Sequence, residues 1–67
     1  MISDYAVVMK DGAGRTVTLY IAGASIDAVI ATGASESQAR DDAESNAFGN
    51  AIAQGLIGAD AWAEAWI

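Results

Sequence analysis

The sequence predicts an α+β fold, a small antiparallel sheet of about three strands with one main helix packed on a face and a short C-terminal helix. Three observations lead to this prediction. Two short alternating segments surround a glycine-containing loop, a capping signal opens a long alanine-rich segment, and a second alanine-rich segment closes the chain. Because the chain has only 67 residues, we expect a single domain that spans residues 1–67.

The first two strands are predicted from the alternation of apolar and polar residues. The segments are residues 4–10 and 15–21, and their alternating apolar positions are Tyr5, Val7, Met9, Val17, Leu19 and Ile21. Strict alternation is typical of a strand with one buried face. The residues between the segments, 11–14, include two glycines that can adopt positive φ angles in a tight loop. Together these features predict a β-hairpin.

The segment 25–32 fits two structures. Its large apolar residues are Ile26, Val29 and Ile30. Their spacing suits one face of a helix, whereas the β-branched content and the short length between two glycines suit a strand. We expect a third strand here, because a sheet of three strands can support a helix better than an isolated hairpin can.

The clearest helix signal lies at Ser35, which is followed three residues later by Gln38 in a capping-box pattern. Glu36 lies in the first turn, where its charge complements the helix dipole. We predict a helix over residues 36–53, with Gly55 as its C-terminal stop.

The predicted helix has an alanine-rich face and a charged face. The packing face consists of Ala39, Ala43, Ala47 and Ala51, with Phe48 and Ile52 beside them. Glu36, Arg40 and Glu44 follow one another at i and i+4, which predicts a solvated ladder of ion pairs. Small alanine side chains should let the helix approach the sheet closely.

Both tryptophans lie in the tail, residues 58–67. Asp60 can cap a short helix in which Trp62 and Trp66 share one face at i+4 spacing. A strand with Glu64 between them would also align the two rings. We expect the helix, because the four alanines of the tail favour it.

Charge and composition narrow the function classes. The chain contains nine acidic and three basic residues, giving a net charge of −6, and has neither histidine nor cysteine. The usual general base, thiolate nucleophiles and zinc ligands are therefore absent, so we expect a protein that is not an enzyme and that holds no metal or cofactor. A surface of this charge repels nucleic acid and anionic membranes and favours basic partners.

The sequence also bears on location. No apolar run approaches the ~20 residues of a membrane span. The first four residues lack the basic start of a signal peptide. We therefore expect an intracellular protein.

Two segments resemble chemical motifs only superficially. Residues 11–16 contain glycines and Arg15, as in a phosphate-binding loop, but a strand pattern follows where such a loop needs a helix. Asp41 and Asp42 are adjacent, and neighbouring helical residues point about 100° apart. These two carboxylates are therefore expected on a solvated helix face and not around a shared metal ion.

The remaining candidates are residues that contact a partner. Trp62 and Trp66 either fold back as a lid on a small core or serve as aromatic anchors for a partner or a second copy of the chain. The carboxylates of the helix can oppose lysine and arginine side chains on another protein. The predicted partner-binding residues are Glu36, Asp41, Asp42, Glu44, Trp62 and Trp66.

The element order and the Ala-Ser-Glu-Ser-Gln-Ala-Arg helix start at residues 34–40, followed by an acidic alanine-rich helix, resemble small phage and mobile-element proteins of the anti-CRISPR type. The resemblance spans roughly residues 4–54 and concerns size, element order and acidity. It implies a non-catalytic inhibitor in the cytoplasm of a bacterial host. Such an inhibitor covers the basic surface with which a CRISPR effector complex recognises target DNA.

The alternative is a phage structural or assembly protein. In that case the exposed apolar surface and the two tryptophans would drive homo-oligomerisation. A core with few large apolar residues also favours a homodimer.

Overall fold

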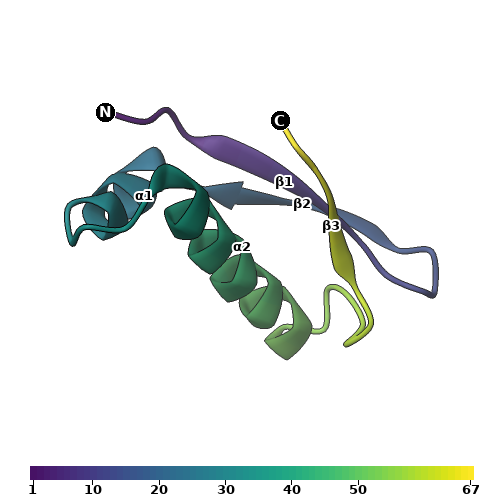
Figure 1. Cartoon of the computed structure of the whole chain (residues 1–67). Helices are drawn as coiled ribbons and strands as arrows, with labels where there is room; N and C mark the ends of the chain where they lie inside the picture. The colour runs from purple at the N-terminus through teal and green to yellow at the C-terminus, as the bar shows by residue number, and fades with distance from the viewer.

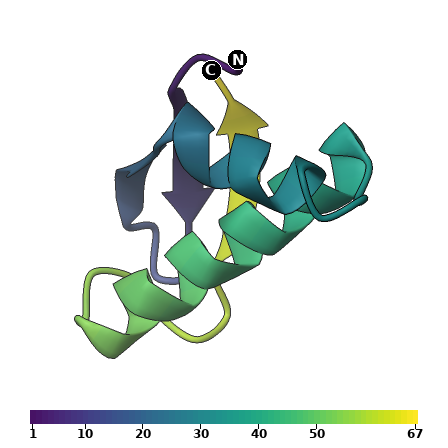
Figure 2. The same ribbon diagram turned by 90° about the vertical axis from the view of Figure 1, so that its left-hand side faces the viewer.

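The computed structural model describes residues 1–67 and contains a three-stranded antiparallel sheet with two helices (Figure 1). In chain order the elements are β1 (Tyr5–Lys10), β2 (Thr16–Ile21), α1 (Gly23–Ile30), α2 (Glu36–Ala53) and β3 (Trp62–Trp66). The strand order is β2-β1-β3, which makes β1 the central strand. Both helices lie on the same face of the sheet (Figures 1 and 2). The α+β class and the three-stranded antiparallel sheet are confirmed.

The β1–β2 hairpin forms as the alternation predicts. Its register runs from Tyr5 opposite Ile21 to Lys10 opposite Thr16, without interruption. The alternating apolar residues of both strands face the helices, whereas Tyr20 on the other face is 83% exposed. Gly14 closes the loop with a φ angle of +87°, a conformation that costs glycine little because it has no Cβ.

A small core lies between the sheet and the helices. Its buried apolar residues are Val7, Met9, Ile21, Ile26, Ala39, Ala51, Ile57 and Ala61. Burying a valine, isoleucine or methionine side chain contributes about 1.5–3 kcal/mol relative to exposure. Three of the eight positions are alanines, so the large side chains that stabilise this fold are few.

The strand expected over residues 25–32 is wrong, since these residues belong largely to the helix α1. Its apolar residues occupy one helical face, and Ile26 is fully buried. No side chain of the preceding residue caps the helix; instead Asp4 Oδ1 accepts a hydrogen bond of 2.8 Å from the Gly23 N–H. The Asp27 carboxylate in turn accepts the Ile2 N–H at 2.9 Å. The N-terminal segment therefore stabilises a helix whose local sequence is ambiguous.

The main helix is confirmed at its predicted bounds. Ser35 accepts a hydrogen bond of 3.1 Å from the Gln38 N–H, which is one half of a capping box. The Gln38 side chain does not complete the box but donates to Asp42 at 2.9 Å. Gly55, with a φ angle of +73°, follows the helix as its stop. The alanine-rich face packs on the core, and Ala39 is fully buried.

Neither helix combines the length and the apolar character needed to cross a lipid bilayer.

The expected C-terminal helix is also wrong, because the tail forms strand β3 on the free edge of β1. Asp60 does not cap a helix there; its carboxylate accepts a hydrogen bond of 3.1 Å from the Gly12 N–H in the hairpin loop. Ile67 exchanges two backbone hydrogen bonds with Ala6 and extends the pairing to the end of the chain. Pairing with a distant strand thus overrides the helix propensity of the alanines.

A β-bulge separates the two tryptophans. β3 pairs with β1 from Trp62 opposite Lys10 to Trp66 opposite Val7, and the register shift leaves Glu64 without an opposite residue. Residues four apart in a regular strand share a face, but one extra residue reverses the alternation. Trp66 therefore lies on the helix side of the sheet and Trp62 on the other side. The prediction of a shared aromatic face is wrong.

The cap at Ser35 can be tested by mutation. Replacing Ser35 with alanine removes the acceptor for the Gln38 N–H and should lower the free energy of unfolding by about 1 kcal/mol. Urea denaturation followed by tryptophan fluorescence measures the change. The matched control is Ser37→Ala, the same substitution at an exposed position in the first turn of α2. Equal urea midpoints for the two variants would contradict the capping role.

Candidate functional site

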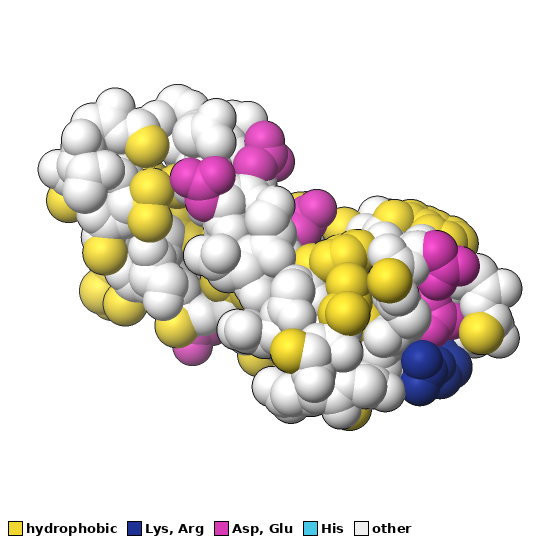
Figure 3. Space-filling model, turned by 90° about the horizontal axis from the view of Figure 1, so that it is seen from below, with side chains coloured by type: hydrophobic (Ala, Val, Ile, Leu, Met, Phe, Trp, Pro, Cys, Tyr) yellow, Lys and Arg dark blue, Asp and Glu magenta, His cyan; other side chains and the backbone are white.

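The four predicted carboxylates of α2 do not form one surface. Asp41 and Asp42 are exposed, as expected. Glu36 forms an ion pair of 3.1 Å with Arg40, and Glu44 turns toward β3. Viewed from the side of α2, the acidic side chains form separate spots among polar and apolar atoms (Figure 3). Of the four, only Asp41 and Asp42 extend from α2 without an ion-pair or sheet contact.

Arg40 lies at the centre of an aromatic cluster. Its guanidinium carbon is 4.1 Å from the centroid of the Tyr5 ring and 5.5 Å from the Trp66 ring. The two rings meet edge to face at a centroid distance of 5.6 Å. The Arg40 Nη2 donates to the Tyr5 hydroxyl, and Nε is buried without a hydrogen-bond partner. Such contacts attract a cation to the negative faces of the rings.

The predicted ladder of ion pairs is therefore only half formed. The pair of Glu36 and Arg40 exists, but Glu44 makes no ion pair with Arg40. Its Oε2 instead accepts a hydrogen bond of 2.6 Å from the indole Nε1 of Trp66. A partly buried indole N–H usually finds an acceptor, and Glu44 supplies it here.

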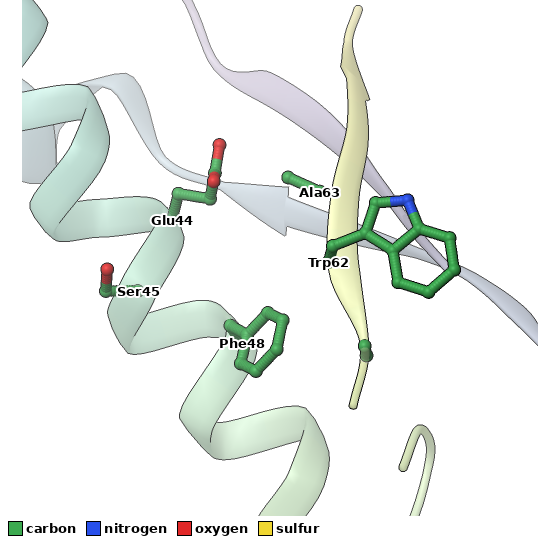
Figure 4. A pocket seen from close by; sticks show the side chains of 6 residues that line it. Glu44, Ser45, Phe48, Trp62 and Ala63 are labelled. Atoms are coloured by element: carbon green, nitrogen blue, oxygen red, sulfur yellow. The ribbon is translucent and has the colours of Figure 1, made fainter. Parts of the chain in front are cut away.

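The two tryptophans have different positions. Trp66 is half-buried and packs against the core, as the lid alternative describes. Trp62 is 48% exposed, and its indole ring is directed away from α2 (Figure 4). Of the two rings, Trp62 is the one that presents an aromatic surface to a partner.

An open groove lies between α2 and β3. It has a volume of about 360 Å³, which is within the range of ligand sites in proteins. The lining residues are Glu44, Ser45, Phe48, Ala61, Trp62 and Ala63. Glu44, Ser45 and Phe48 line the α2 wall, and the Phe48 ring is directed toward β3 (Figure 4).

The groove exists because the residues of β3 and its approach that face α2 are small. Ala63 lies opposite Met9 and therefore on the helix side of the sheet, and Ala61 is buried just before the strand. A methyl group at these positions leaves space beneath Phe48 that a larger side chain would fill. The groove is thus a consequence of residue size at two positions of the tail.

Sequence reasoning did not identify most of this groove. Ser45, Ala61 and Ala63 carried no signal, and Phe48 was placed on the packing flank of the helix. Glu44 and Trp62 were predicted as partner-binding residues, and the structure brings both to the groove. The missing information was the β1–β3 pairing, which no local pattern contains.

The hairpin loop holds a buried carboxylate that sequence reasoning also missed. Asp11 is 2% exposed and accepts four hydrogen bonds, from the N–H groups of Ala13, Arg15 and Gly58 and from the Arg15 Nε, at 2.8–3.1 Å. The Arg15 Nη1 donates to the Gly55 carbonyl at 3.0 Å. Asp11 and Arg15 therefore connect the hairpin loop to the segment between α2 and β3.

These hydrogen bonds stabilise the charged form of Asp11. The Gly58 N–H makes the largest contribution, and the backbone and side chain of Arg15 add to it, whereas burial acts in the opposite direction. The result is that the pKa of the Asp11 carboxyl lies below its ordinary value of 3.8. The sequence contains part of this information. An Asp before a Gly-rich loop often accepts the N–H of the residue two positions later, as Asp11 does from Ala13.

Most of the basic charge is used inside the protein. Arg15 pairs with Asp11, and Arg40 pairs with Glu36. Lys10 is the one basic side chain without an ion pair. No group of three carboxylates is arranged to hold a metal ion. Apart from Lys10, the charged side chains without an ion pair are therefore carboxylates.

The comparisons with known proteins identify no relative. No protein-family model matches the chain, and no curated protein or solved structure is significantly similar to it.

The buried carboxylate predicts a specific pH dependence. Because the folded pKa of Asp11 is lowered, its stabilising effect is complete above the ordinary value of 3.8 and is lost as the pH falls through the folded pKa. Asp11→Asn replaces one acceptor oxygen by an N–H₂ that opposes the surrounding donors. The variant should have a lower urea midpoint than the parent at pH 7, and the difference should shrink below pH 3.8.

The control for this experiment is Asp41→Asn, which changes an exposed carboxyl that has no hydrogen-bond partner. Its urea midpoint should follow that of the parent at every pH. A difference between parent and Asp11→Asn that stays constant from pH 7 to pH 2 would show that the Asp11 charge does not stabilise the fold.

Proposed function

We propose that this protein is a non-catalytic acidic inhibitor that acts in the cytoplasm of a bacterial host. It covers the basic surface with which a CRISPR effector complex recognises target DNA. The observation that supports this proposal is the distribution of charge. Nine acidic residues against three basic ones give a net charge of −6, and both arginines already pair with carboxylates of the same chain.

Asp41 and Asp42 are the carboxylates of α2 that suit such a contact. Both are exposed on the side of α2 away from the sheet, and neither forms an ion pair. They can oppose lysine and arginine side chains that otherwise bind DNA phosphates. Glu36 contributes less, because Arg40 balances its charge.

The electrostatic contact can be tested by charge reversal. The double variant Asp41→Lys with Asp42→Lys should fold like the parent, because both side chains are exposed. It should weaken inhibition of target-DNA binding by about tenfold or more, since two attractive contacts become repulsive. Inhibition by the parent should also weaken steeply as salt is raised. Competition binding with the effector complex and labelled target DNA measures both effects.

Single variants provide the matched comparison. Asp41→Lys and Glu64→Lys change the net charge by the same amount at exposed positions, one on α2 and one in the bulge of β3. If α2 is the contact surface, Asp41→Lys should have the larger effect. Asp11 is unsuitable as a control, because its carboxylate is buried and holds two loops together. Equal inhibition by the double variant and the parent would exclude an electrostatic contact through Asp41 and Asp42.

One observation favours a second function, assembly through the uncovered face of the sheet. Both helices lie on one side, so nothing covers the other side of the three strands (Figure 2). Tyr20 from β2 and Trp62 from β3 are exposed on that side, and Val8 of β1 is only half-buried between them. Exposed aromatic side chains on an uncovered sheet face are typical of a protein contact surface. A phage structural or assembly protein would use it to join copies of itself.

Sedimentation equilibrium tests this alternative. If the uncovered face joins two copies, a species near twice 6.8 kDa should appear at tens of micromolar protein. Trp62→Ser and Tyr20→Ser should each shift the equilibrium toward the monomer, because both remove exposed aromatic surface from the contact. The control is Leu56→Ser, which removes an exposed apolar side chain in the segment between α2 and β3. A parent that stays monomeric at this concentration would contradict assembly.

A further inference from the structure

The groove between α2 and β3 combines an apolar lining with one carboxylate. Phe48, Ala61 and Ala63 are among its hydrophobic lining residues, and Glu44 lines it from α2 (Figure 4). Glu44 Oε2 accepts the indole N–H of Trp66, whereas Oε1 accepts no hydrogen bond. The free oxygen can therefore bind a donor from outside the chain.

No cation of this chain reaches that oxygen. Arg15 is held by Asp11, and Arg40 is held between Tyr5 and Trp66. Lys10 lies opposite Trp62 on the side of the sheet away from α2. Glu44 therefore has no ion pair, and it lines the groove together with the Phe48 ring. In a protein of net charge −6, this combination complements a cation on an aliphatic chain.

We propose that the groove receives a lysine side chain of the basic partner. The inference rests on the proposed function, because it specifies how the inhibitor recognises the basic surface. The methylene groups pack on Phe48 and the two alanines, and the ammonium group binds Glu44 Oε1. The lysine stem is flexible and apolar, which suits an open groove of about 360 Å³.

The geometry favours lysine over arginine. An arginine gains most from a carboxylate when it binds both oxygens in a fork. The Trp66 indole N–H already binds Oε2 of Glu44 at 2.6 Å, so an arginine fork would have to share that oxygen with the indole. A compact ammonium group needs no more than one oxygen.

The test uses the full chain and three blocked peptides, acetyl-Gly-Lys-Gly-amide and its arginine and norleucine counterparts. Norleucine retains the aliphatic stem without the charge. In an amide-detected NMR titration, the lysine peptide should shift the resonances of Phe48, Ala61, Ala63 and the Trp66 indole, with a dissociation constant on the order of millimolar. The norleucine peptide should shift them less at equal concentration. Equal shifts from norleucine, or tighter binding of the arginine peptide, would overturn the proposal.

Two charge-removing variants separate the groove from the general acidity. Glu44→Gln keeps an oxygen that accepts the Trp66 indole N–H but removes the negative charge. Glu64→Gln removes the same charge from an exposed residue that does not line the groove. Glu44→Gln should weaken binding of the lysine peptide by about two- to fivefold, whereas Glu64→Gln should leave it unchanged. Equal weakening by both variants would indicate attraction by net charge and contradict a defined site.

A third variant covers the case in which Glu44→Gln disturbs the fold. Ser45→Lys places an ammonium group from an exposed position beside the groove, where it should compete with the peptide and weaken its binding. Unchanged peptide binding by Ser45→Lys would contradict the proposal. Shifts of the groove resonances that depend on protein concentration without peptide would identify a second copy of the chain as the occupant, which also contradicts it.

The lysine site in the groove and the proposed inhibitor function can be rejected independently of each other. Loss of inhibition in the Asp41 and Asp42 double variant, together with no effect of Glu44→Gln on either inhibition or peptide binding, would retain the inhibitor and reject the lysine site. Specific binding of the lysine peptide by a protein that inhibits no effector complex would retain the site and reject the inhibitor.

Discussion

The hydrogen bonds to the buried carboxylate of Asp11 are the interaction on which the arrangement of the strands depends. Asp11 accepts N–H groups from its own hairpin loop and from Gly58, which follows α2. These contacts bring the end of the helix segment next to the end of β1, and Asp60 adds a second link to Gly12. The tail can then run back antiparallel to β1 and complete the sheet. A buried charge is tolerated here because four donors replace its water shell.

The same arrangement explains why aromatic residues of similar sequence context have different roles. The bulge in β3 directs Trp66 toward α2 and Trp62 away from it. Trp66 then meets Arg40 and donates its indole N–H to Oε2 of Glu44. The small residues on the inner side of β3 leave the groove open beside Phe48. One extra residue in a strand therefore determines both the exposed aromatic surface and the shape of the groove.

Acidic residues in this protein have two uses that net charge alone does not distinguish. Asp4, Asp11, Asp27 and Asp60 accept backbone N–H groups and hold distant segments together. Asp41, Asp42 and Glu64 extend into solvent, where their charge is available to a partner. The acidic residues thus have a structural role as well as a proposed functional one, because some of their carboxylates cap loops and a helix N-terminus.

Local patterns in the sequence determined the hairpin, the bounds of α2 and the exposure of Asp41 and Asp42. Alternation, turn glycines and the Ser35 cap act between residues close in the chain, so their physical effect is visible without the fold. The tertiary structure alone decided the helix over Gly23–Ile30, the strand over Trp62–Trp66 and the groove. Both segments have ambiguous local preferences, and contacts with residues far away in sequence select between the alternatives: Asp4 and Asp27 for the helix, β1 and Asp11 for the strand. Pairing energies between distant segments exceed the small differences in propensity, which is why the tail of alanines became a strand.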